Sequence, residues 1–298
     1  MRIVTRPDFD GVVCAALLYE AEEITEPVYW VEPNEMQKGM VDVYPGDIIA
    51  NLPYHDKCSM WFDHHYTNKP KTPFKGAFEI APSAAGIVFN YYKDKFKKDY
   101  KELVLETDRI DAADLTLDQV LFPENYPYIL LSMTLSGFDK SDEQYWNSLV
   151  QLLRVSDVIE IHKEQEIYRR CQIVIEQNKL FKNLLTENTK IKGHISITDF
   201  RSFNEAPRGN RFLVYSIYPE TVVSVKIRRD INTPDKIIIG VGHSIFNRNC
   251  QVNVGKMLSQ FGGGGHRGAG SCTVPENQAD KCLSLISETL HINQSNEK

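Results

Sequence analysis

Two aspartates follow a short apolar run near the start of the chain, in the stretch RPDFDGVV, where Asp8 and Asp10 lie two residues apart. Residues 2–5 are typical of a first strand, and open parallel sheets bind ligands beyond the carboxyl ends of their strands. Two carboxylates on such a loop are hard oxygen donors that suit Mg²⁺ or Mn²⁺. Helix capping by Asp10, beside Gly11, is the structural alternative.

A carboxylate and two histidines stand side by side after the apolar residues 60–62, as Asp63, His64 and His65. Imidazole combined with carboxylate is a mixed donor set that suits Mn²⁺ better than Ca²⁺. A neighbouring carboxylate can also hold the second nitrogen of a neutral histidine and so fix its tautomer. The pattern predicts a functional cluster at the end of another strand, and a hydrogen-bonded structural cluster is the alternative.

A further acidic position is Asp108 in the stretch LETDRID, which follows another apolar segment. A lone aspartate carries little information by itself. Asp111 and Asp114 lie just beyond it, and they could equally cap turns or short helices.

The stretch GGGGHRGAG, residues 262–270, directly follows a predicted helix. Consecutive glycines let backbone amides approach an anion closely, and adjacent amides can form an anion-binding nest. His266 and Arg267 add donors for phosphate oxygens, and arginine can bind them in bidentate fashion. The pattern predicts a ligand loop rather than a mobile glycine linker.

The bulk properties are those of a soluble two-domain protein. The 298 residues carry a net charge of −6, which argues against coating of long duplex nucleic acid but leaves room for a small phosphorylated ligand. The six cysteines form no C-x-x-C pair and are typical of reduced thiols. The first residues lack a basic and apolar leader, and no apolar run reaches the length of a membrane helix, so a cytoplasmic location is expected.

Strands alternate with helices in the first half of the chain, which indicates a mostly parallel α/β sheet. The predicted strands are residues 2–5, EPVYWVEP, GDIIANLP and SMWF, and the predicted helices begin near Gly11 and at Pro82-Ser83. Helical spacing then dominates from about 124 to 191. We expect a domain over residues 1–155 and a helical connector over 156–191.

The period changes to two after residue 191, which indicates strands. The predicted strands there are HISITDF, RFLVYSIY, TVVSVKIRR and KIIIGVG, followed by a helix at 252–261, the glycine loop and a helix at 279–290. Residues 192–298 are therefore expected to form a second, smaller α/β domain.

The order of these motifs resembles the DHH/DHHA1 phosphoesterase family, in particular its exopolyphosphatase-related and oligoribonuclease-like members. The resemblance is carried by an Asp-x-Asp after the first strand, the literal Asp-His-His, a later aspartate and the GGGGH loop. It covers almost the whole chain, and it implies a parallel-sheet DHH domain, a connector and a DHHA1 domain that binds substrate.

The resemblance also implies roles for individual residues. Asp8, Asp10, His64 and Asp108 would be metal ligands, and His65 would contact substrate or orient the site. In the second domain, Gly262, Gly263, Gly264, Gly265, His266 and Arg267 would hold the substrate phosphate, and Arg248 is a looser match to a substrate-binding arginine. The ion would be Mn²⁺, with Mg²⁺ as the second candidate.

Two positions depart from the family pattern. Arg6 stands where the family usually has a histidine, and a guanidinium has no lone pair for a metal. Asn51 stands where the family has an aspartate that bridges two ions, although Asp47 or Asp56 could be the true counterpart. These departures predict one ion instead of two, held by Asp10, Asn51, His64 and Asp108. Arg6 would supply the missing positive charge to a substrate phosphate. A simple salt bridge from Arg6 to Asp8, with reduced activity, is the alternative.

The sequence therefore predicts a Mn²⁺-dependent phosphoesterase whose catalytic residues are Arg6, Asp63, His64 and His65. Its substrate would be a short single-stranded oligonucleotide or a 3′-phosphonucleotide, with polyphosphate as the second choice, bound in a cleft between the domains. The alternative is a nucleotide- or phosphate-binding module of the same fold that turns nothing over. No membrane partner is expected, and a homodimer is one expectation.

Overall fold

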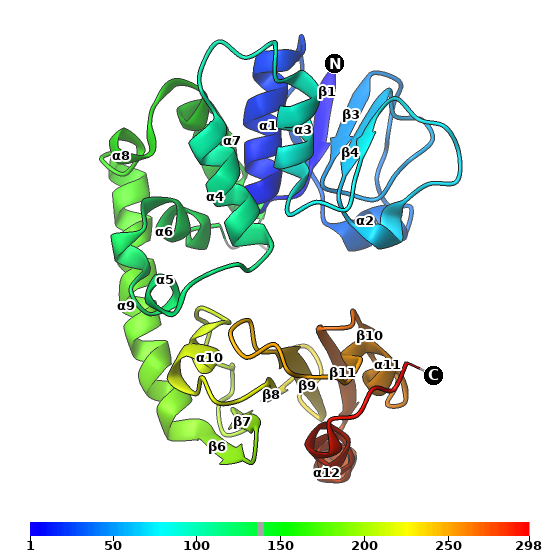
Figure 1. The fold of residues 1–298 in the computed structure, drawn as a ribbon, viewed down its shortest axis with the longest axis vertical. Helices are drawn as coiled ribbons and strands as arrows, with labels where there is room; N and C mark the ends of the chain where they lie inside the picture. The colour runs from blue at the N-terminus through cyan, green and yellow to red at the C-terminus, as the bar shows by residue number, and fades with distance from the viewer. Residues whose placement is uncertain (136–139, 298) are drawn as a thin grey trace. The chain divides into compact units, whose positions relative to one another are not determined.

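The computed structural model describes residues 1–135 and 140–297, which divide into two compact units. Unit 1 comprises Met1–Leu115 and Pro123–Gln172, and unit 2 comprises Thr116–Phe122 and Ile173–Lys298. The division falls inside the predicted connector, because helix α9 (Gln165–Asn188) contributes residues to both units (Figure 1). No helix among the described residues is long and apolar enough to cross a bilayer.

Unit 1 is built on a five-stranded sheet in the order β2-β1-β3-β4-β5, and every neighbouring pair is parallel. The strands are β1 (Arg2–Thr5), β2 (Tyr29–Trp30), β3 (Asp47–Ala50), β4 (Met60–Asp63) and β5 (Gly76–Phe78). Nearly all residues of β1, β3 and β4 are buried, as expected for parallel strands covered on both faces. The parallel α/β architecture predicted for this half of the chain is thus confirmed.

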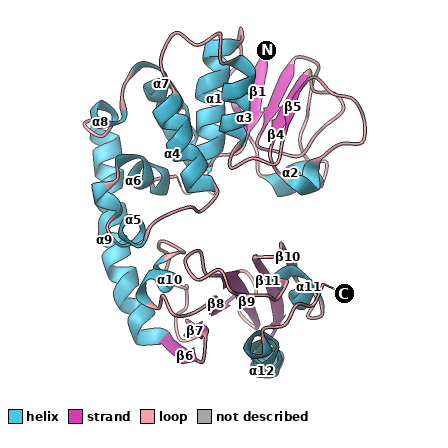
Figure 2. Cartoon of the chain, in the orientation of Figure 1, coloured by secondary structure: helices cyan, strands magenta, loops and turns pink. Residues whose placement is uncertain are grey.

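Helices cover this sheet and pack against one another. They are α1 (Phe9–Ala21), α2 (Pro33–Gln37), α3 (Ala84–Tyr92), α4 (Lys101–Asp111), α6 (Pro127–Met133), α7 (Glu143–Val155) and α8 (Val158–Ile161), with single 3₁₀ turns at Tyr66–Asn68, Pro123–Asn125 and Lys140–Asp142. Helix α1 lies against β1 and contacts α3, α4 and α7 (Figures 1 and 2). Its central position fixes the loop that joins it to β1.

The register of the sheet aligns three strand ends. Thr5 pairs with Ala50, and Ala50 pairs with Phe62. The residues that follow these positions are Arg6, Asn51 and Asp63, so three side chains of the predicted site leave the sheet at one edge.

Unit 2 contains a six-stranded sheet in the order β10-β11-β9-β8-β7-β6. Only β7 and β8 are parallel within it, and the remaining pairs are antiparallel. Its elements are α5 (Leu117–Leu121), β6 (Thr189–Lys192), β7 (Ile195–Asp199), α10 (Leu213–Ile217), β8 (Val223–Arg229), β9 (Lys236–His243), α11 (Val254–Ser259), β10 (Gly264–Gly265), β11 (Ala269–Pro275) and α12 (Glu276–Ile292). This is the mixed α/β second domain that the sequence predicts.

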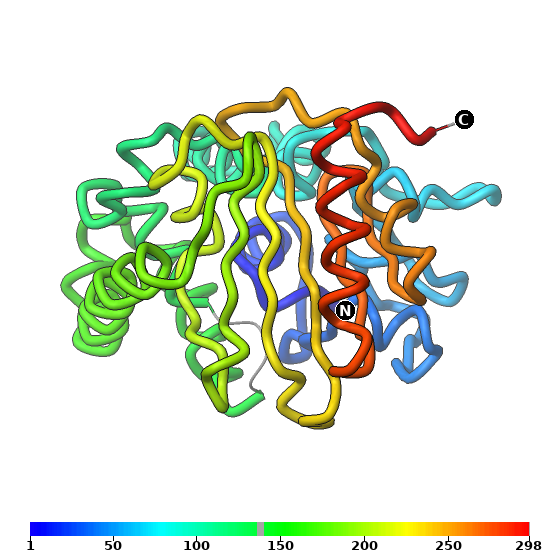
Figure 3. Tube along the Cα trace, turned by 90° about the horizontal axis from the view of Figure 1, so that it is seen from below, coloured from blue at the N-terminus to red at the C-terminus, as the bar shows by residue number. Residues whose placement is uncertain are grey.

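One face of the unit 2 sheet forms the core of that unit. Alternate residues of β8 and β9, such as Val225 and Ile239, pack in one buried cluster with Ile286 and Leu290 of α12. Figure 3 shows α12, in red, running alongside the strands. The opposite face is therefore free of this helix.

The segment RFLVYSIY was predicted as a strand, and that prediction was wrong, because residues 213–217 form helix α10. Leu213, Val214 and Tyr215 are buried in sequence rather than alternately. The Tyr215 hydroxyl also bonds the Ser224 hydroxyl at 2.9 Å, which anchors the helix on β8. Tertiary packing here overrides the strand propensity of β-branched and aromatic residues.

Candidate metal centre and glycine loop

Asp63 is the last residue of β4, and its fully buried carboxylate organises the turn that follows. It accepts hydrogen bonds from the His64 amide at 2.9 Å, from His65 Nδ1 at 2.8 Å and from Asn68 Nδ2 at 2.7 Å. These donors occupy both carboxylate oxygens. Asp63 therefore holds the two histidines in place.

The His64 ring is held in one tautomer. Its Nδ1 lies 3.0 Å from the Ala81 carbonyl oxygen, which can only accept, so Nδ1 carries the proton and Nε2 keeps a lone pair. Nε2 is buried and has no hydrogen-bond partner among the described residues. The nearest charged atoms are Asp111 Oδ2 at 3.4 Å and Asp10 Oδ2 at 3.8 Å. A buried lone pair beside two carboxylates is an electron-rich group that a bound cation would stabilise.

Asp10 lies in the first turn of α1 and its side chain is fully buried. Its oxygens accept the amides of Ala84, at 2.9 Å, and Ala85, at 2.7 Å, which open helix α3. Burial and the neighbouring Asp8 carboxylate raise the pKa of Asp10 to about 7, with a partly offsetting effect of the two amides and His65. The two amides orient the carboxylate toward His64.

Asp111 ends helix α4 and completes the cluster. Burial and the neighbouring Asp10 carboxylate raise the pKa of Asp111 to about 7. One donor atom from each of Asp10, His64 and Asp111 lies within 4.8 Å of the others. Two ligands of an octahedral ion with bonds of about 2.1 Å stand roughly 3–4 Å apart, so small movements would suffice for Mg²⁺ or Mn²⁺.

Asp108, the predicted ligand, lies one turn earlier on α4 and has a different partner. Its Oδ1 accepts a hydrogen bond from the Ser83 hydroxyl, which caps α3. A Cβ on Gly86 would come within 2.9 Å of this carboxylate, so α3 approaches it closely. The structure thus groups Asp111, rather than Asp108, with Asp10 and His64. The signal was present in the sequence, because residues at i and i+3 share one face of a helix.

Asp8 caps α1 and makes three contacts. Its Oδ1 accepts the Gly11 amide at 2.9 Å and Asn51 Nδ2 at 3.0 Å, and its Oδ2 lies 3.1 Å from Arg6 Nη1. The Arg6 Nε lies 3.5 Å from a Glu32 carboxylate oxygen. Arg6 is therefore placed between two carboxylates, where a divalent ion would otherwise be expected to bind.

Asn51 adopts an unusual backbone conformation directly after β3. Its φ of 55° lies in the left-handed region, its side chain is buried, and its Oδ1 has no partner among the described residues. Strain at a non-glycine residue with an orphaned acceptor points to a ligand contact. Asp47 binds Arg2 at the other end of β3, and Asp56 lies on an exposed loop next to His55, so neither shares this edge.

The glycine loop of unit 2 uses most of its backbone amides internally. The amides of Gly262 and Gly263 donate to Ser259 and Leu258, and the His266 amide donates to Ala269. Gly264 and Gly265 form β10 and pair with β11. The loop therefore does not form the open nest of backbone amides that the sequence predicts.

The side chains around the loop are more accessible. His266 and Arg267 are exposed, and Arg267 Nε lies 3.1 Å from Glu297. Arg248, in the segment before α11, donates from Nε to the Ile245 carbonyl at 3.0 Å. The Arg267 guanidinium has five donors, so its contact with Glu297 leaves further donors that can bind a phosphate.

Solved structures with the same fold are known. The chain is 29% identical to the pGpG-specific phosphodiesterase PggH of Vibrio cholerae, with a TM-score of 0.86 over 98% of this chain and 99% of that one. An exopolyphosphatase-related protein of Bacteroides fragilis matches at 12% identity and a TM-score of 0.53, over 98% and 91%. RecJ of Thermus thermophilus, solved with Mn²⁺, matches at 13% and 0.57, over 98% of this chain and 52% of that one. No protein-family model and no curated protein matches the sequence.

The likeness to PggH spans both units, and the Asp-His-His sequence ends the fourth strand of a parallel sheet. The shared two-domain fold and this likeness support the assignment of the chain to the DHH/DHHA1 phosphoesterase family. Its structural neighbours include hydrolases, namely the phosphodiesterase PggH and the exonuclease RecJ. In this DHH/DHHA1 chain the side chain at position 6 is an arginine paired with Asp8, and the side chain at position 51 is a neutral amide.

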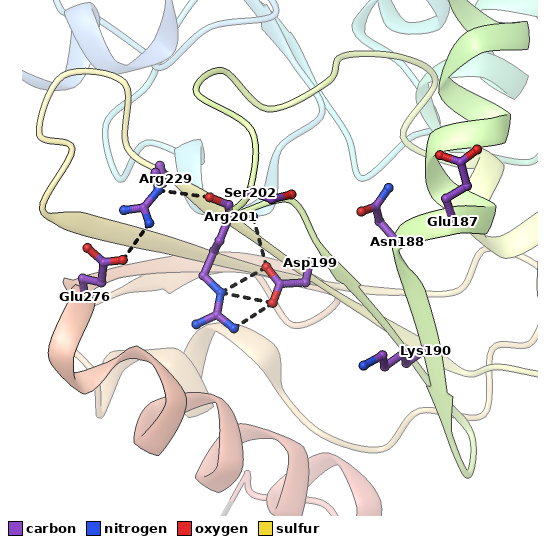
Figure 4. A pocket seen from close by; sticks show the side chains of 8 residues that line it. All are labelled: Glu187, Asn188, Lys190, Asp199, Arg201, Ser202, Arg229 and Glu276. Carbon is purple, nitrogen blue, oxygen red and sulfur yellow. Dashed lines mark hydrogen bonds and ion pairs between the residues drawn. The ribbon is translucent and has the colours of Figure 1, made fainter.

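A separate pocket of about 530 Å³ opens in unit 2 (Figure 4). It is lined by Glu187, Asn188, Lys190, Asp199, Arg201, Ser202, Arg229 and Glu276. Arg201 is bound by Asp199 and Asp280, and Arg229 is bound by Glu276 and two backbone carbonyls. The arginines are thus engaged in ion pairs, and the pocket contains none of the site residues that the sequence predicts for this DHH/DHHA1 protein.

Proposed function

We propose that the chain is a Mn²⁺-dependent phosphodiesterase that hydrolyses short linear oligonucleotides, and that a single ion is held by Asp10, His64 and Asp111. The observation that carries the proposal is the buried, unpaired Nε2 of His64 beside two carboxylates of raised pKa. The full-length likeness to a pGpG-specific phosphodiesterase supports a linear dinucleotide as substrate. Mg²⁺ is the second candidate ion, and polyphosphate is the second candidate substrate.

The donor set fits this ion, which would polarise the phosphoryl group and lower the pKa of a bound water. The chain's own residues prepare the site in other ways. The Ala81 carbonyl keeps the lone pair of His64 on Nε2, and the amides of Ala84 and Ala85 orient Asp10. His65 is half-buried, and its hydrogen bond to Asp63 raises its pKa, so a protonated His65 can donate to a phosphate oxygen.

Arg6 takes the role of a second cation in this proposal. Asp8 Oδ1 already accepts hydrogen bonds from Gly11 and Asn51, and Oδ2 forms the ion pair with Arg6, so both oxygens are engaged where an ion would have to bind. The guanidinium has five donors, and its contact with Asp8 uses one of them. The remaining donors can bind a phosphate oxygen and neutralise charge that develops during the reaction. The Oδ1 of Asn51, which has no partner among the described residues, would accept a hydrogen bond from the substrate or coordinate the ion.

Unit 2 supplies the substrate-binding residues in this proposal. His266, Arg267 and Arg248 would contact phosphate oxygens. Gly262–Gly265 have no side chains, which would let a phosphate approach the backbone of the loop closely. The net charge of −6 disfavours long duplex substrates.

A second candidate function is binding without turnover. It is favoured by the ion pair between Arg6 and Asp8, which neutralises one of the two acidic groups after β1. In that case the chain would sense a nucleotide or phosphate ligand rather than consume it.

Calorimetric titration with Mn²⁺ and a turnover assay with pGpG test both candidates. One ion per chain and turnover that is lost in His64→Ala support the single-ion phosphodiesterase. A matched control is His55→Ala, because His55 also neighbours a carboxylate, Asp56, but lies on an exposed loop. Binding of pGpG without any turnover would favour the sensing module, and two tight ions per chain would refute the single-ion view.

A further inference from the structure

Strand β8 places two cations on the sheet face that points away from α12. Val223, Val225 and Ile227 alternate into the core cluster, so Lys226 and Arg228 leave the opposite face. They are two residues apart, which puts their side chains side by side on that face.

Lys226 has no acidic partner among the described residues, whereas Arg228 interacts electrostatically with Asp230 without a hydrogen bond. Among the described residues, no ion pair or hydrogen bond involves the side chain of Lys226 or Arg228, whereas Arg201 and Arg229 in the same unit are both paired. Burial lowers the pKa of Lys226, and the neighbouring Arg228 lowers it further. A half-buried ammonium without a counter-ion costs stability, and such groups mark functional sites more often than structural ones.

The sheet beside Lys226 is open. Lys226 pairs with Gly240 of β9, Gly240 pairs with Ser271 of β11, and Ser271 pairs with Gly264 of the glycine loop. A Cβ on Gly240 would meet only the Lys226 carbonyl, at 3.9 Å. The cross-strand row that begins at Lys226 therefore continues through the small residues Gly240 and Ser271 to Gly264 in the glycine loop.

An aromatic side chain borders this opening at the next row of the sheet. Ser224 pairs with Gly242 there, and a Cβ on Gly242 would come within 2.7 Å of the Tyr215 hydroxyl. That hydroxyl bonds Ser224. A Cβ at Gly242 would thus meet Tyr215, whereas a Cβ at Gly240 would meet no side chain within 4 Å. The sheet surface next to Lys226 therefore has space above Gly240, and this space is called the recess.

We propose that Lys226, Arg228 and the recess over Gly240 form an anion subsite that binds the terminal phosphate of a phosphorylated dinucleotide. The identity of this ligand rests on the proposed function, whereas the subsite itself rests on the unpaired Lys226, the neighbouring Arg228 and the open row of small residues. Gly264 lies three strands from Lys226, roughly 14 Å at about 4.8 Å per strand. This length suits a ligand with two phosphates better than a single inorganic phosphate.

The test compares the affinities of pGpG and GpG, which lacks the terminal phosphate, for the full chain in EDTA, where turnover is prevented. In Lys226→Met the preference for pGpG over GpG should fall about tenfold, as expected for the loss of one charge-assisted hydrogen bond. Gly240→Val should weaken pGpG binding at least as much, because it fills the recess and keeps both charges. Lys190→Met is the control, since it removes the same charge from the pocket on the other face.

Thermal unfolding distinguishes a ligand site from a structural role. Lys226→Met should raise Tm, because it removes an uncompensated half-buried charge, whereas a structural lysine would lower Tm on removal. An unchanged preference for pGpG in Lys226→Met, or a loss that appears in Lys190→Met instead, would overturn the subsite.

Turnover by the wild type with Mn²⁺ separates this proposal from the proposed function. If pGpG is hydrolysed but binds Lys226→Met as tightly as the wild type, the proposed function is supported and the subsite is refuted. If pGpG is neither bound nor hydrolysed, the proposed function falls, and inorganic triphosphate becomes the probe. Weaker triphosphate binding in Lys226→Met would then support the subsite, and equal binding would overturn it.

Discussion

The unprotonated nitrogen of His64 lies 3.4 Å from the carboxylate of Asp111, with no donor between them among the described residues. Two acceptors at this distance repel each other unless a proton or a cation lies between them. The Ala81 carbonyl holds the ring proton on the other nitrogen, so the ring does not supply it. This relationship makes Asp111 the first residue to test for a role in metal binding.

Asp111→Asn should weaken Mn²⁺ binding by about 10- to 100-fold, the usual range for loss of a metal-site partner. Asp108→Asn is the matched comparison, because it makes the same change one turn earlier on the same helix. Its main effect should be on stability, about 1 kcal/mol, since it weakens the hydrogen bond with Ser83. Calorimetry and thermal unfolding measure the two effects. A larger loss of Mn²⁺ affinity in Asp108→Asn than in Asp111→Asn would show that Asp108, rather than Asp111, is the metal ligand.

The metal-free protein should become less stable as pH rises from about 4 to 7. Asp10 and Asp111 have folded-state pKa values near 7, above the unfolded value of 3.8, so the folded state binds more protons in this window. Stability is then fully present below pH 4 and is lost as both groups ionise, by an amount on the order of a few kcal/mol. Urea unfolding in EDTA at pH 5.5 and pH 8 measures the difference.

Mn²⁺ should reverse this trend, because the ion replaces the bound protons and its affinity rises with pH. Asp10→Asn removes one of the two titrating groups and should flatten the pH dependence of the metal-free protein. A metal-free protein that gains stability between pH 5.5 and pH 8 would contradict the raised pKa values.

Gly11→Ala should destabilise the protein by about 2–4 kcal/mol, in the range of severe backbone conflicts. A Cβ at this position would lie 2.0 Å from the Arg6 carbonyl oxygen, so the turn between β1 and α1 has to move. Gly240→Ala is the control, because its Cβ makes only an ordinary contact. Denaturant unfolding of both variants gives the comparison. A Gly11→Ala protein as stable as the control would show that the turn is not tightly constrained.

The sequence predicts four of the five strands of unit 1, because each of those four is a short apolar run bounded by prolines or polar turns. It misses β5, whose three residues are only half-buried and include a glycine. It does not separate Asp108 from Asp111, because the two aspartates lie three residues apart on α4 and share one face of that helix, so only their tertiary partners distinguish them. It also misplaces residues 213–217, where packing against β8 decides the conformation. The internal bonding of the Gly262 and Gly263 amides depends on their pairing with α11, which local composition does not encode.

The double change Arg6→His and Asn51→Asp should raise the number of Mn²⁺ ions from one to two per chain. Arg6 now forms an ion pair with Asp8 and Asn51 donates a hydrogen bond to it, and both substitutions exchange donors for ligand atoms. Asp8 would then be free to bind a second ion together with the new histidine and aspartate. Calorimetric stoichiometry or the Mn²⁺ content after gel filtration measures the outcome.

The two single variants show which departure matters. Arg6→His alone removes the resident cation, and Asn51→Asp alone adds a carboxylate that Arg6 can pair with, so neither should bind a second ion as tightly as the double variant. Glu32 provides the control, because Glu32→Gln weakens the other ion pair of Arg6 without adding a ligand. A double variant that still binds one ion would mean that Arg6 and Asn51 do not stand in for a metal, and the single-ion explanation of this site would then need another cause.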